Sequence, residues 1–363
     1  MTTVFAIDLG NKQTKMTDGN NTYVYPSVLL PEKNIRSAFS LGAVKGMTEF
    51  KSSSENGSFY WGPAILEYGK DNLRDSLSAD RRYFNRIFKQ LCVFALAKLA
   101  NDYDLAHDGV LVVDRVVAGL PSADYENDEN VNQVKKIFSG QHLVEIDGDP
   151  VTLKVKEVNV IPQSTGTLLD IVYKGFDAEK PEKSKITKAQ LELRELVQKG
   201  KIGIVDIGGG TILLDMLVRG ALSPQHRNQL NRGANSLYEA IANDIMKEHN
   251  VNADVHVVET MVREGMTTGN FVYKRSMNNK FEVTDIVASE IRDWTLEAVD
   301  NINSTFKSMG DIDILLVTGG GSEIVDKELM KEEFPEVQVQ FVEGAETANV
   351  LGFWHQGRIL ESK

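Results

Sequence analysis

The sequence has little of what marks secreted and membrane proteins. Cys92 is the only cysteine among 363 residues, so no internal disulfide can form and we expect a cytoplasmic protein. No apolar run approaches the ~18 residues that a membrane-spanning helix needs. Residues 1–10 lack the basic segment and cleavage site of a signal peptide, and residues 357–363 show no amphipathic anchor. We therefore expect no association with a membrane.

Positive charge is also scarce. Forty Lys and Arg residues against fifty-two Asp and Glu residues give a formal net charge of −12. A protein that binds nucleic acid without sequence preference needs a basic surface for the phosphates. The composition therefore argues against direct binding of nucleic acid.

Several common catalytic motifs are missing as well. The chain contains no G-x-x-x-x-G-K-[ST], G-x-G-x-x-G, H-E-x-x-H, paired C-x-x-C or G-x-S-x-G. These absences exclude a P-loop and a Rossmann fingerprint, and they leave no motif for a zinc site or a serine nucleophile elbow.

What the sequence does contain is an alternation of strand and helix patterns, which predicts an α/β fold. The length predicts two domains. We place the first over residues 1–170, with a small inserted subdomain at about 31–79, and the second over 171–344. A final helix at about 345–363 is expected to pack back on the first domain. The charged segment 174–188 is interpreted as a loop or linker.

Periodicity and β-branched runs predict the individual elements. Strands are expected at residues 4–7, 110–120, 155–161, 202–207, 213–218, 312–317 and 337–342. Helices are expected at residues 80–100, 189–199, 285–308 and 346–355. In the helix at 80–100, Phe84 and Ile87 should begin a buried stripe and Cys92 should be a packed thiol.

A strand followed by Asp-x-Gly occurs twice, about half a chain apart, which suggests two related halves. In the first copy Asp8 ends the strand, and Gly10 permits a tight turn that leaves main-chain amides free to face an anion. Side chains that can add to a phosphate site follow at Asn11, Lys12, Thr14 and Lys15. Because a carboxylate repels phosphate, Asp8 indicates an intervening Mg²⁺ ion with its waters. The alternative is a hairpin turn without a ligand.

In the second copy Asp206 is followed by Gly208, Gly209, Gly210 and Thr211. Ordering three consecutive glycines costs backbone entropy. That cost indicates a position where a ligand must approach the main chain closely. Thr211 can donate to a phosphate, and Asp206 can hold a metal-bound water or orient an attacking water. The alternative is a glycine-rich hairpin that binds nothing.

Two further segments follow predicted strands. Residues 318–322 again place glycines after a strand, but without an acidic residue. The exposed main chain of such a segment suits contact with an adenine or a ribose. A simple tight turn is the alternative. Gln163 follows Pro162 and can hold a water in line with a phosphorus atom. From the residues alone, a helix cap at Ser164 or Thr165 is the preferred interpretation of that segment.

The order of these segments along the chain resembles that in the superfamily of actin, sugar kinases and heat-shock chaperones. They match its first phosphate loop, first connecting helix, second phosphate loop, adenosine loop and, at 345–352, its second connecting helix. Within the superfamily the chain is similar to bacterial plasmid segregation proteins of the ParM type. That similarity rests on Asp8-x-Gly10-Asn11-x-x-x-Lys15, on Gly119-Leu120-Pro121 and on Val160-Ile161-Pro162-Gln163-Ser164.

The resemblance implies an actin-like fold, in which two related α/β domains have a nucleotide cleft between them. It implies that Asp8 and Asp206 hold Mg²⁺ through water and that Gln163 positions the attacking water. The implied nucleotide contacts are Gly10, Asn11, Lys12, Thr14, Lys15, Gly208, Gly209, Gly210, Thr211, Gly233, Arg263, Glu264, Gly319, Gly320, Gly321 and Ser322. The charged insertion before Lys201 and the segment 31–79 depart from the family pattern.

The function that this resemblance implies is that of a filament-forming ATPase, with GTP as an alternative nucleotide. Hydrolysis would limit the lifetime of the filament. An adaptor protein would attach plasmid or phage DNA to the filament. A small-molecule kinase of the same superfamily is the main alternative, although residues 60–150 contain no motif for its catalytic Asp. A membrane-associated bacterial actin homologue would need an amphipathic terminus. A chaperone would need a substrate-binding domain for which the length leaves no room.

Overall fold

The computed structural model describes residues 2–34, 46–53, 57–68, 70–77, 81–178 and 180–362. The chain divides into two compact units, the first made of Met1–Thr187 with Thr347–Lys363 and the second of Lys188–Glu346. Residues 171–187, which we expected to begin the second domain, thus belong to the first unit. Helix α5 (Ser164–Tyr173) runs through the expected boundary, and Lys185 N donates to Gly175 O at 2.9 Å to close the loop that follows it.

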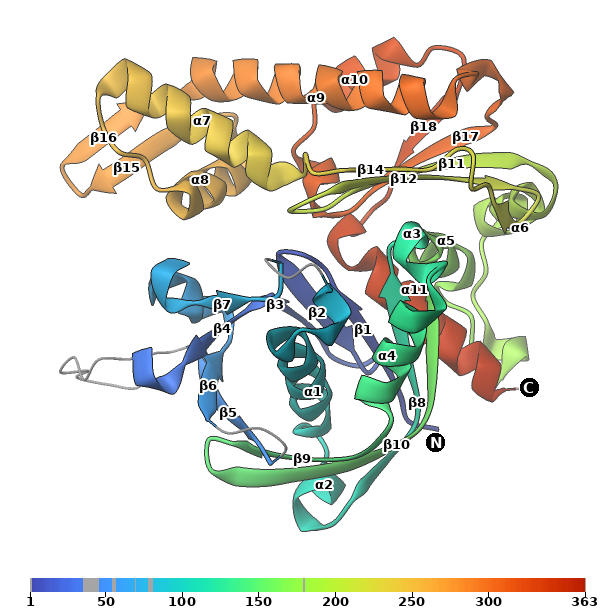
Figure 1. Cartoon of the computed structure of the whole chain (residues 1–363). Coiled ribbons are helices and arrows are strands. Elements are labelled where there is room, and N and C mark those ends of the chain that lie inside the picture. The colour runs from blue at the N-terminus through green and yellow to red at the C-terminus, as the bar shows by residue number, and fades with distance from the viewer. Residues whose placement is uncertain are drawn as a thin grey trace. The chain divides into compact units, whose positions relative to one another are not determined.

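The first unit contains a ten-stranded sheet with the order β3-β2-β1-β8-β10-β9-β5-β6-β4-β7 (Figure 1). Its strands are β1 (Val4–Leu9), β2 (Gln13–Thr17), β3 (Thr22–Pro26), β4 (Val28–Pro31), β5 (Thr48–Ser52), β6 (Ser58–Trp61), β7 (Arg74–Asp75), β8 (Leu111–Leu120), β9 (Gly140–Ile146) and β10 (Asp149–Pro162). Strands β1, β8 and β10 are parallel neighbours. Their carboxyl ends therefore lie at the same edge of the sheet.

The segment that we expected to be an inserted subdomain, at about 31–79, extends this sheet. Strand β5 pairs with β9, with Phe50 opposite Ile146, and β6 and β4 follow outward from it. Residues 35–45, 54–56, 69 and 78–80 of the segment lie outside the described residues.

The helices of the first unit are α1 (Arg86–Ala100), α2 (Asp104–Asp108), α3 (Ser122–Tyr125), α4 (Asp128–Phe138) and α5, together with most of α11 (Ala345–Glu361). The side chain of Asn85 caps α1 by accepting a hydrogen bond from Ile87 N at 2.7 Å. The helix therefore begins after Phe84, which is 39% exposed, and the expected start at residue 80 is wrong. Cys92 is fully buried in α1, and burial raises the pKa of its thiol.

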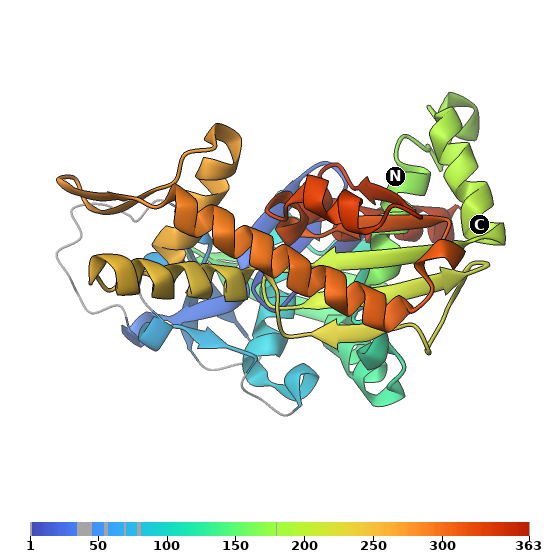
Figure 2. The same cartoon turned by 90° about the horizontal axis from the view of Figure 1, so that it is seen from above.

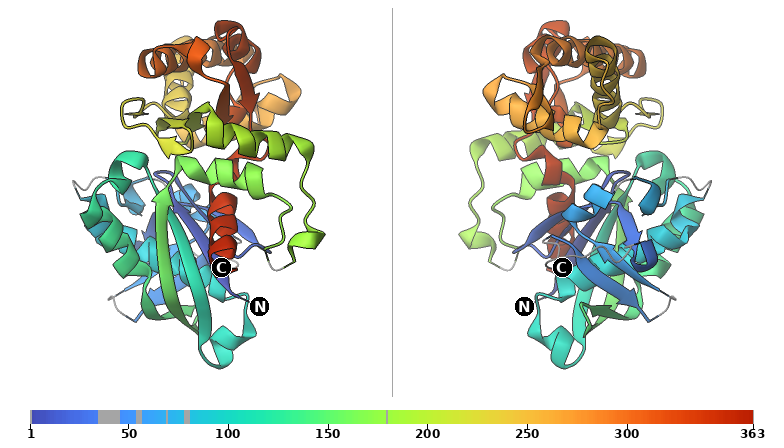
Figure 3. Two further views of the ribbon diagram at one scale, coloured as in Figure 1. Left: turned by 90° about the vertical axis from the view of Figure 1, so that its right-hand side faces the viewer. Right: turned by 90° about the vertical axis from the view of Figure 1, so that its left-hand side faces the viewer.

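Helix α11 packs against α5 within the first unit (Figure 3). The two backbones approach so closely that a β-carbon on Gly352 would overlap Gly166 O. Asn349 Oδ1 accepts hydrogen bonds from Thr167 N at 3.0 Å and from Thr167 Oγ1 at 2.9 Å. Helix α11 ends at Glu361, close to the end of the final helix expected at about 345–363 and beyond the 346–355 that periodicity alone predicted.

The second unit contains a smaller sheet with the order β13-β12-β11-β17-β18, and β14 also pairs with β12. Its strands are β11 (Lys201–Ile207), β12 (Ile212–Val218), β13 (Ala221–Leu222), β14 (Asn228–Leu230), β17 (Ile314–Thr318) and β18 (Gln338–Phe341). Its helices are α6 (Lys188–Lys199), α7 (Ala234–His249), α8 (Val255–Thr268), α9 (Thr284–Phe306) and α10 (Lys327–Glu333). Strands β15 (Val272–Ser276) and β16 (Asn279–Glu282) form a separate hairpin at the beginning of α9 (Figure 2).

Each unit encloses its own hydrophobic core. In the first, the ring centroid of Phe50 lies 5.7 Å from that of Trp61 and 5.1 Å from that of Phe94. In the second, helices α7 and α9 bury Tyr238 and Trp294. Burying one large apolar side chain contributes about 1.5–3 kcal/mol. Among the described residues, no helix has the length and apolar character that crossing a membrane requires.

Candidate functional site

The loop between β1 and β2 in the first unit begins at a buried carboxylate. Asp8 is 1% exposed and lies opposite Lys15 in the β1–β2 register. A β-carbon on Gly10 would lie 2.8 Å from Gln13 O, so the tight turn requires glycine there. Asn11 is partly exposed and Lys12 is exposed at the turn. The hairpin thus brings together most of the residues that the sequence predicted for this loop.

Two side chains from other segments hold this loop in place. Ser27 Oγ donates to Gly10 O at 2.8 Å and accepts from Thr14 Oγ1 at 3.0 Å. Arg82 Nη2 donates to Leu9 O at 2.8 Å and to Gly10 O at 3.0 Å. The hydroxyl of Thr14 therefore lies inside the fold and supports the turn.

Neither supporting residue was anticipated. The sequence between residues 16 and 82 offers no motif that marks Ser27 or Arg82. Their roles depend on long-range packing against the loop.

The glycine loop after β11 in the second unit is held by the N-terminal end of α7. Ala234 N donates to Gly208 O at 3.0 Å, and Asn235 N donates to Gly209 O at 2.8 Å. Gly233 fits between them, because a β-carbon there would lie 2.5 Å from Gly208 O. Asp206, at the end of β11, is 3% exposed.

These contacts turn the carbonyl groups of the loop toward α7. Among the described residues, the main-chain amides of Gly209, Gly210 and Thr211 have no hydrogen-bond partner. Successive unpartnered N–H groups in a turn form a concave site for an anion. In the first loop the amides of Asn11 and Lys12 likewise lack a partner within the described part of the chain.

The third glycine segment follows β17, which is the parallel neighbour of β11. Thr318 pairs with Asp206, and Gly319 has a φ of +82°. A β-carbon on Gly319 would overlap the carboxylate of Asp206, and one on Gly321 would overlap the side chain of Ile207. Both glycines are therefore needed to pack this segment on β11, whether or not a ligand is bound.

The hydroxyl of Ser322 is also used within the segment. It is buried and donates to Gly319 O at 2.7 Å. This bond closes the turn after β17, so the side chain holds the main chain of the segment.

Arg263 on α8 lies in a charged cluster next to Gly320. Its Nε is 3.2 Å from Glu259 Oε1, and its Nη1 is 3.5 Å from Glu346 Oε1. A β-carbon on Gly320 would lie 3.5 Å from the same oxygen of Glu346. Burial lowers the pKa of the Arg263 guanidinium, but Tyr238, Glu259 and Glu346 raise it more, so the net shift is upward.

Glu264, the next residue on α8, is exposed. Consecutive helical residues point about 100° apart, so Glu264 does not share the direction of Arg263. Of the two residues predicted on this helix, only Arg263 contacts the cluster beside Gly320. Glu259, Glu346 and Tyr238 complete that cluster, and sequence reasoning missed all three.

Gln163 lies between the end of β10 and the first turn of α5. Its main-chain N donates to Leu120 O at 2.7 Å, at the end of the neighbouring strand β8. Thr165 Oγ1 donates to Pro162 O at 2.7 Å, a local bond at the start of the helix. Because β1, β8 and β10 are parallel neighbours, Gln163 and Asp8 lie at the same edge of the first sheet.

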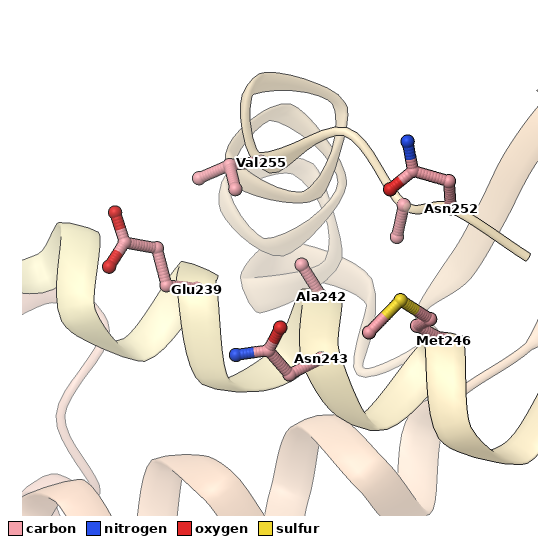
Figure 4. A pocket seen from close by; sticks show the side chains of 7 residues that line it. Glu239, Ala242, Asn243, Met246, Asn252 and Val255 are labelled. Carbon is pink, nitrogen blue, oxygen red and sulfur yellow. The ribbon is translucent and has the colours of Figure 1, made fainter.

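A separate cavity of about 300 Å³ lies in the second unit, between α7 and the chain that leads into α8. In Figure 4, Glu239, Asn243 and Met246 on α7 line it together with Asn252 and Val255. Its lining residues differ from those predicted to bind a nucleotide.

The donors at the predicted metal site suit Mg²⁺. This ion prefers oxygen ligands and retains several waters. Asp8 and Asp206 are buried carboxylates, each at the head of a loop with unpartnered amides. Within its own unit, each loop can therefore offer oxygen toward a cation and N–H groups toward phosphate.

Family models match both units. Residues 6–166 match the model described as the N-terminal domain of actin-like proteins, and residues 201–343 match the Alp7A C-terminal domain. Together the two matches span most of the chain. The chain therefore belongs to the actin-like proteins.

Solved structures agree with this assignment of the fold. The apo pSK41 ParM protein is 22% identical, with a TM-score of 0.72 over 99% of this chain and 98% of that one. The archaeal actin homologue Ta0583 in complex with ADP is 15% identical, with a TM-score of 0.74 over 98% and 99%. A 15-stranded ParM filament from Clostridium botulinum is 17% identical, with a TM-score of 0.72 over 98% and 99%. No curated protein sequence matches the chain. The expected actin-like fold is confirmed.

Proposed function

We propose that this protein binds and hydrolyses ATP with Mg²⁺ and assembles head to tail into filaments that segregate plasmid or phage DNA. The observation that carries the proposal is the pair of Asp-headed loops with unpartnered amides. The first loop offers Asn11 and Lys12, and the second offers residues 209–211. Such amides suit the oxygens of a polyphosphate, and the buried carboxylates suit the cation that accompanies it.

Each predicted residue then has a defined task. Asp8 and Asp206 hold Mg²⁺ through its waters, and Lys15 adds positive charge beside the phosphates. The ion, when bound, neutralises charge that develops on the phosphate oxygens. The side-chain amide of Gln163 orients the attacking water without acting as a formal base. The main chain of residues 319–321 and the side chain of Arg263 contact the adenosine.

Two relatives support the nucleotide and the assembly. The archaeal homologue was solved with ADP, and the clostridial ParM was solved as a filament. The net charge of −12 supports indirect attachment to DNA, since an acidic surface repels phosphates. We therefore assign DNA contact to an adaptor protein, and place the whole system in the cytoplasm.

Light scattering with simultaneous phosphate release tests the proposal. Pure protein is mixed with Mg²⁺ and ATP, GTP, ADP or no nucleotide, and the polymer is pelleted. We expect scattering to rise above a critical concentration with triphosphate and to fall as phosphate appears. A flat trace without phosphate release, at every salt concentration, contradicts the proposal. It would favour a kinase and call for a screen of phosphate acceptors.

Gln163→Ala separates hydrolysis from assembly. Losing the oriented water should slow phosphate release by about 10²-fold while ATP still drives assembly, so filaments should persist longer. Turnover and filament lifetime are measured in the same tube. Gln141→Ala, at an exposed position on β9, is the matched control and should behave like wild type. Loss of ATP binding in Gln163→Ala would show that the assigned role is wrong.

A further inference from the structure

The cavity of the second unit has a firmly held wall opposite α7. This wall is the segment 250–254, which joins α7 to α8. Asn250 adopts a left-handed conformation with a φ of +53°, and Val251 is buried. Asp254 N donates to the hydroxyl of Tyr273 at 3.0 Å, and the side chain of Asp254 caps the beginning of α8. The chain therefore holds this wall in place without a ligand.

The polar lining of the cavity offers hydrogen-bond acceptors and one negative charge. It consists of Glu239 and Asn243, one turn apart on α7, and of Asn252 from the opposite wall (Figure 4). A carboxylate only accepts hydrogen bonds, and the carbonyl oxygen of an asparagine amide accepts them too. Among the described residues, neither asparagine side chain has a hydrogen-bond partner. The lining contains no basic side chain, so it favours a cation over an anion.

The carboxylate of Glu239 is held by its own helix. Asn235 Nδ2 donates to Glu239 Oε1 at 2.5 Å. A carboxylate has about four acceptor sites, so this bond leaves Glu239 able to accept from a ligand. Within the described part of the chain, no Lys or Arg side chain forms an ion pair with it. The negative charge is therefore fixed in place but not neutralised.

The rest of the lining is apolar. Ala242 is buried, Ala253 and Val255 are half-buried, and Met246 is 45% exposed. Aliphatic stems of cationic groups bury themselves on such surfaces and keep the charged end beside polar groups. The flexible side chain of methionine adapts to the shape of what it contacts. An aliphatic chain with a cationic end therefore matches both parts of the lining.

The size and the donor set restrict the ligand further. A volume of about 300 Å³ lies at the lower end of the range for small-molecule pockets. A bare metal ion suits the lining poorly, because the described residues include no group of three or more His, Cys, Asp or Glu side chains that could hold one. An anion would meet the carboxylate of Glu239 without a compensating cation.

We propose that this cavity binds a small aliphatic amine, and that the ligand is a free polyamine. One ammonium group donates to Glu239 and to the amide oxygen of Asn243 or Asn252, and the methylene chain packs on Met246 and Val255. The net charge of −12 attracts polycations to the protein. The site is separate from the proposed nucleotide site and goes beyond the proposed function. A lysine side chain of another protein carries the same ammonium group, so the experiment must distinguish the two sources.

NMR of protein with ¹³C-labelled methionine methyl groups tests the proposal. Spermidine is titrated into the full chain without nucleotide or Mg²⁺, at constant ionic strength. We expect the methyl signal of Met246, assigned from Met246→Leu, to shift until it saturates. Met277, which is 90% exposed and lies outside the cavity, should keep its signal. A Met246 signal that stays still, or that moves in step with that of Met277, overturns the proposal.

Two variants with matched controls test the lining by calorimetry. Glu239→Gln should weaken spermidine binding about tenfold, because a charge-assisted hydrogen bond becomes a neutral one. Glu248→Gln, exposed further along α7 and outside the lining, should bind like wild type. Asn243→Trp fills the cavity from an exposed position and should abolish binding, whereas Asn303→Trp, exposed on α9, should not. Equal affinities for Glu239→Gln and Glu248→Gln would mean that spermidine binds elsewhere, and the proposal would be wrong.

A second ligand identifies the source of the amine. Nα-acetyl-lysine methylamide carries one lysine side chain. Tenfold weaker binding of this compound than of spermidine supports a free polyamine, whereas equal affinities overturn that assignment in favour of a protein lysine. These measurements involve neither nucleotide nor polymer, so they are independent of the proposed function. Amine binding without assembly supports this site and contradicts the filament, and assembly without amine binding does the reverse.

Discussion

The loop after β1 is held by side chains, whereas the loop after β11 is held by the main chain of a helix. Ser27 and Arg82 bond the carbonyls of the first loop. Amides at the beginning of α7 bond the carbonyls of the second. In both loops, main-chain amides lack a partner among the described residues and can bind an anion, although different groups hold the two loops in place. Replacing a side chain should therefore loosen the first loop, whereas adding a β-carbon should disturb the second.

Removing the acid at the head of each loop tests whether the two loops serve one ion. In the proposed function Asp8 and Asp206 hold one hydrated Mg²⁺ ion, so Asp206→Ala and Asp8→Ala should each lower Mg²⁺-dependent turnover by about 10³-fold with the fold retained. Phosphate release and circular dichroism provide the measurements. Asp285→Ala, at an exposed position on α9, should keep normal turnover. Turnover close to wild type in Asp206→Ala would remove that residue from the mechanism.

Gly233→Ala tests the main-chain support of the second loop. The added methyl group would lie 2.5 Å from both Gly208 O and Thr211 N, which forces the loop away from α7. We expect a loss of about 2 kcal/mol in unfolding free energy, measured by urea denaturation, and weaker nucleotide binding. Asn235→Ala, two positions further on, keeps the main-chain bond and should lose less than about 0.5 kcal/mol. Equal losses in both variants would contradict the steric account.

Arg82→Ala tests the side-chain support of the first loop. It leaves the carbonyls of Leu9 and Gly10 without their charged donor, which should cost about 1.5 kcal/mol of stability and weaken nucleotide binding about tenfold. A fluorescent nucleotide and thermal unfolding report the two effects. Neighbouring Arg81 pairs with Glu129 at the surface, so Arg81→Ala should change little. If the two variants behave alike, the first loop does not depend on this support.

The smallest expected effect lies outside both loops, at Glu290 on α9. Burial, and then the hydrogen bond and charge of Asp244, raise the pKa of Glu290 to about 7. Because the pKa of Glu290 is raised, its protonated carboxyl group contributes to the stability of the fold. This contribution is complete below pH 4.5, the ordinary pKa of the group, and is lost as the pH rises toward 7. Glu290→Gln should remove this pH-dependent loss of stability, which amounts to a few tenths of a kcal/mol for such a partly exposed pair.

Urea denaturation at pH 5.5 and pH 8 measures the effect. Glu264→Gln, exposed on α8, is the matched control and should show the wild-type dependence on pH. An unchanged pH dependence in Glu290→Gln would show that this carboxyl does not gain its proton near neutrality.

The strand ends were predictable because their signals are local. Buried apolar runs that lead into Asp8 and Asp206 identified β1 and β11, and Pro162 marked the end of β10. The expected strands at 110–120 and 312–317 correspond to β8 and β17. Such patterns depend only on residues adjacent in sequence.

What could not be predicted depends on distant partners. Thr14 and Ser322 were expected to face a ligand, yet Ser27 and the carbonyl of Gly319 engage their hydroxyls. Helices α7 and α8 were not anticipated, although α7 supports the second loop. The expected start of α1 at residue 80 was also wrong, because the side chain of Asn85 caps the helix after Phe84. Hydrophobic periodicity carries no information on which carbonyl a remote side chain will reach.

The packing of α11 on α5 has a consequence for the order of synthesis. Residues 188–346 form the second unit from one continuous stretch, whereas the first unit needs residues from both ends of the chain. At about 5–20 residues per second, the ribosome needs roughly 8 to 32 s to make the second unit after Thr187 has been added. Throughout that interval the surface of α5 around Gly166 lacks its partner helix. The nascent first unit therefore remains incomplete until the ribosome has released the last helix.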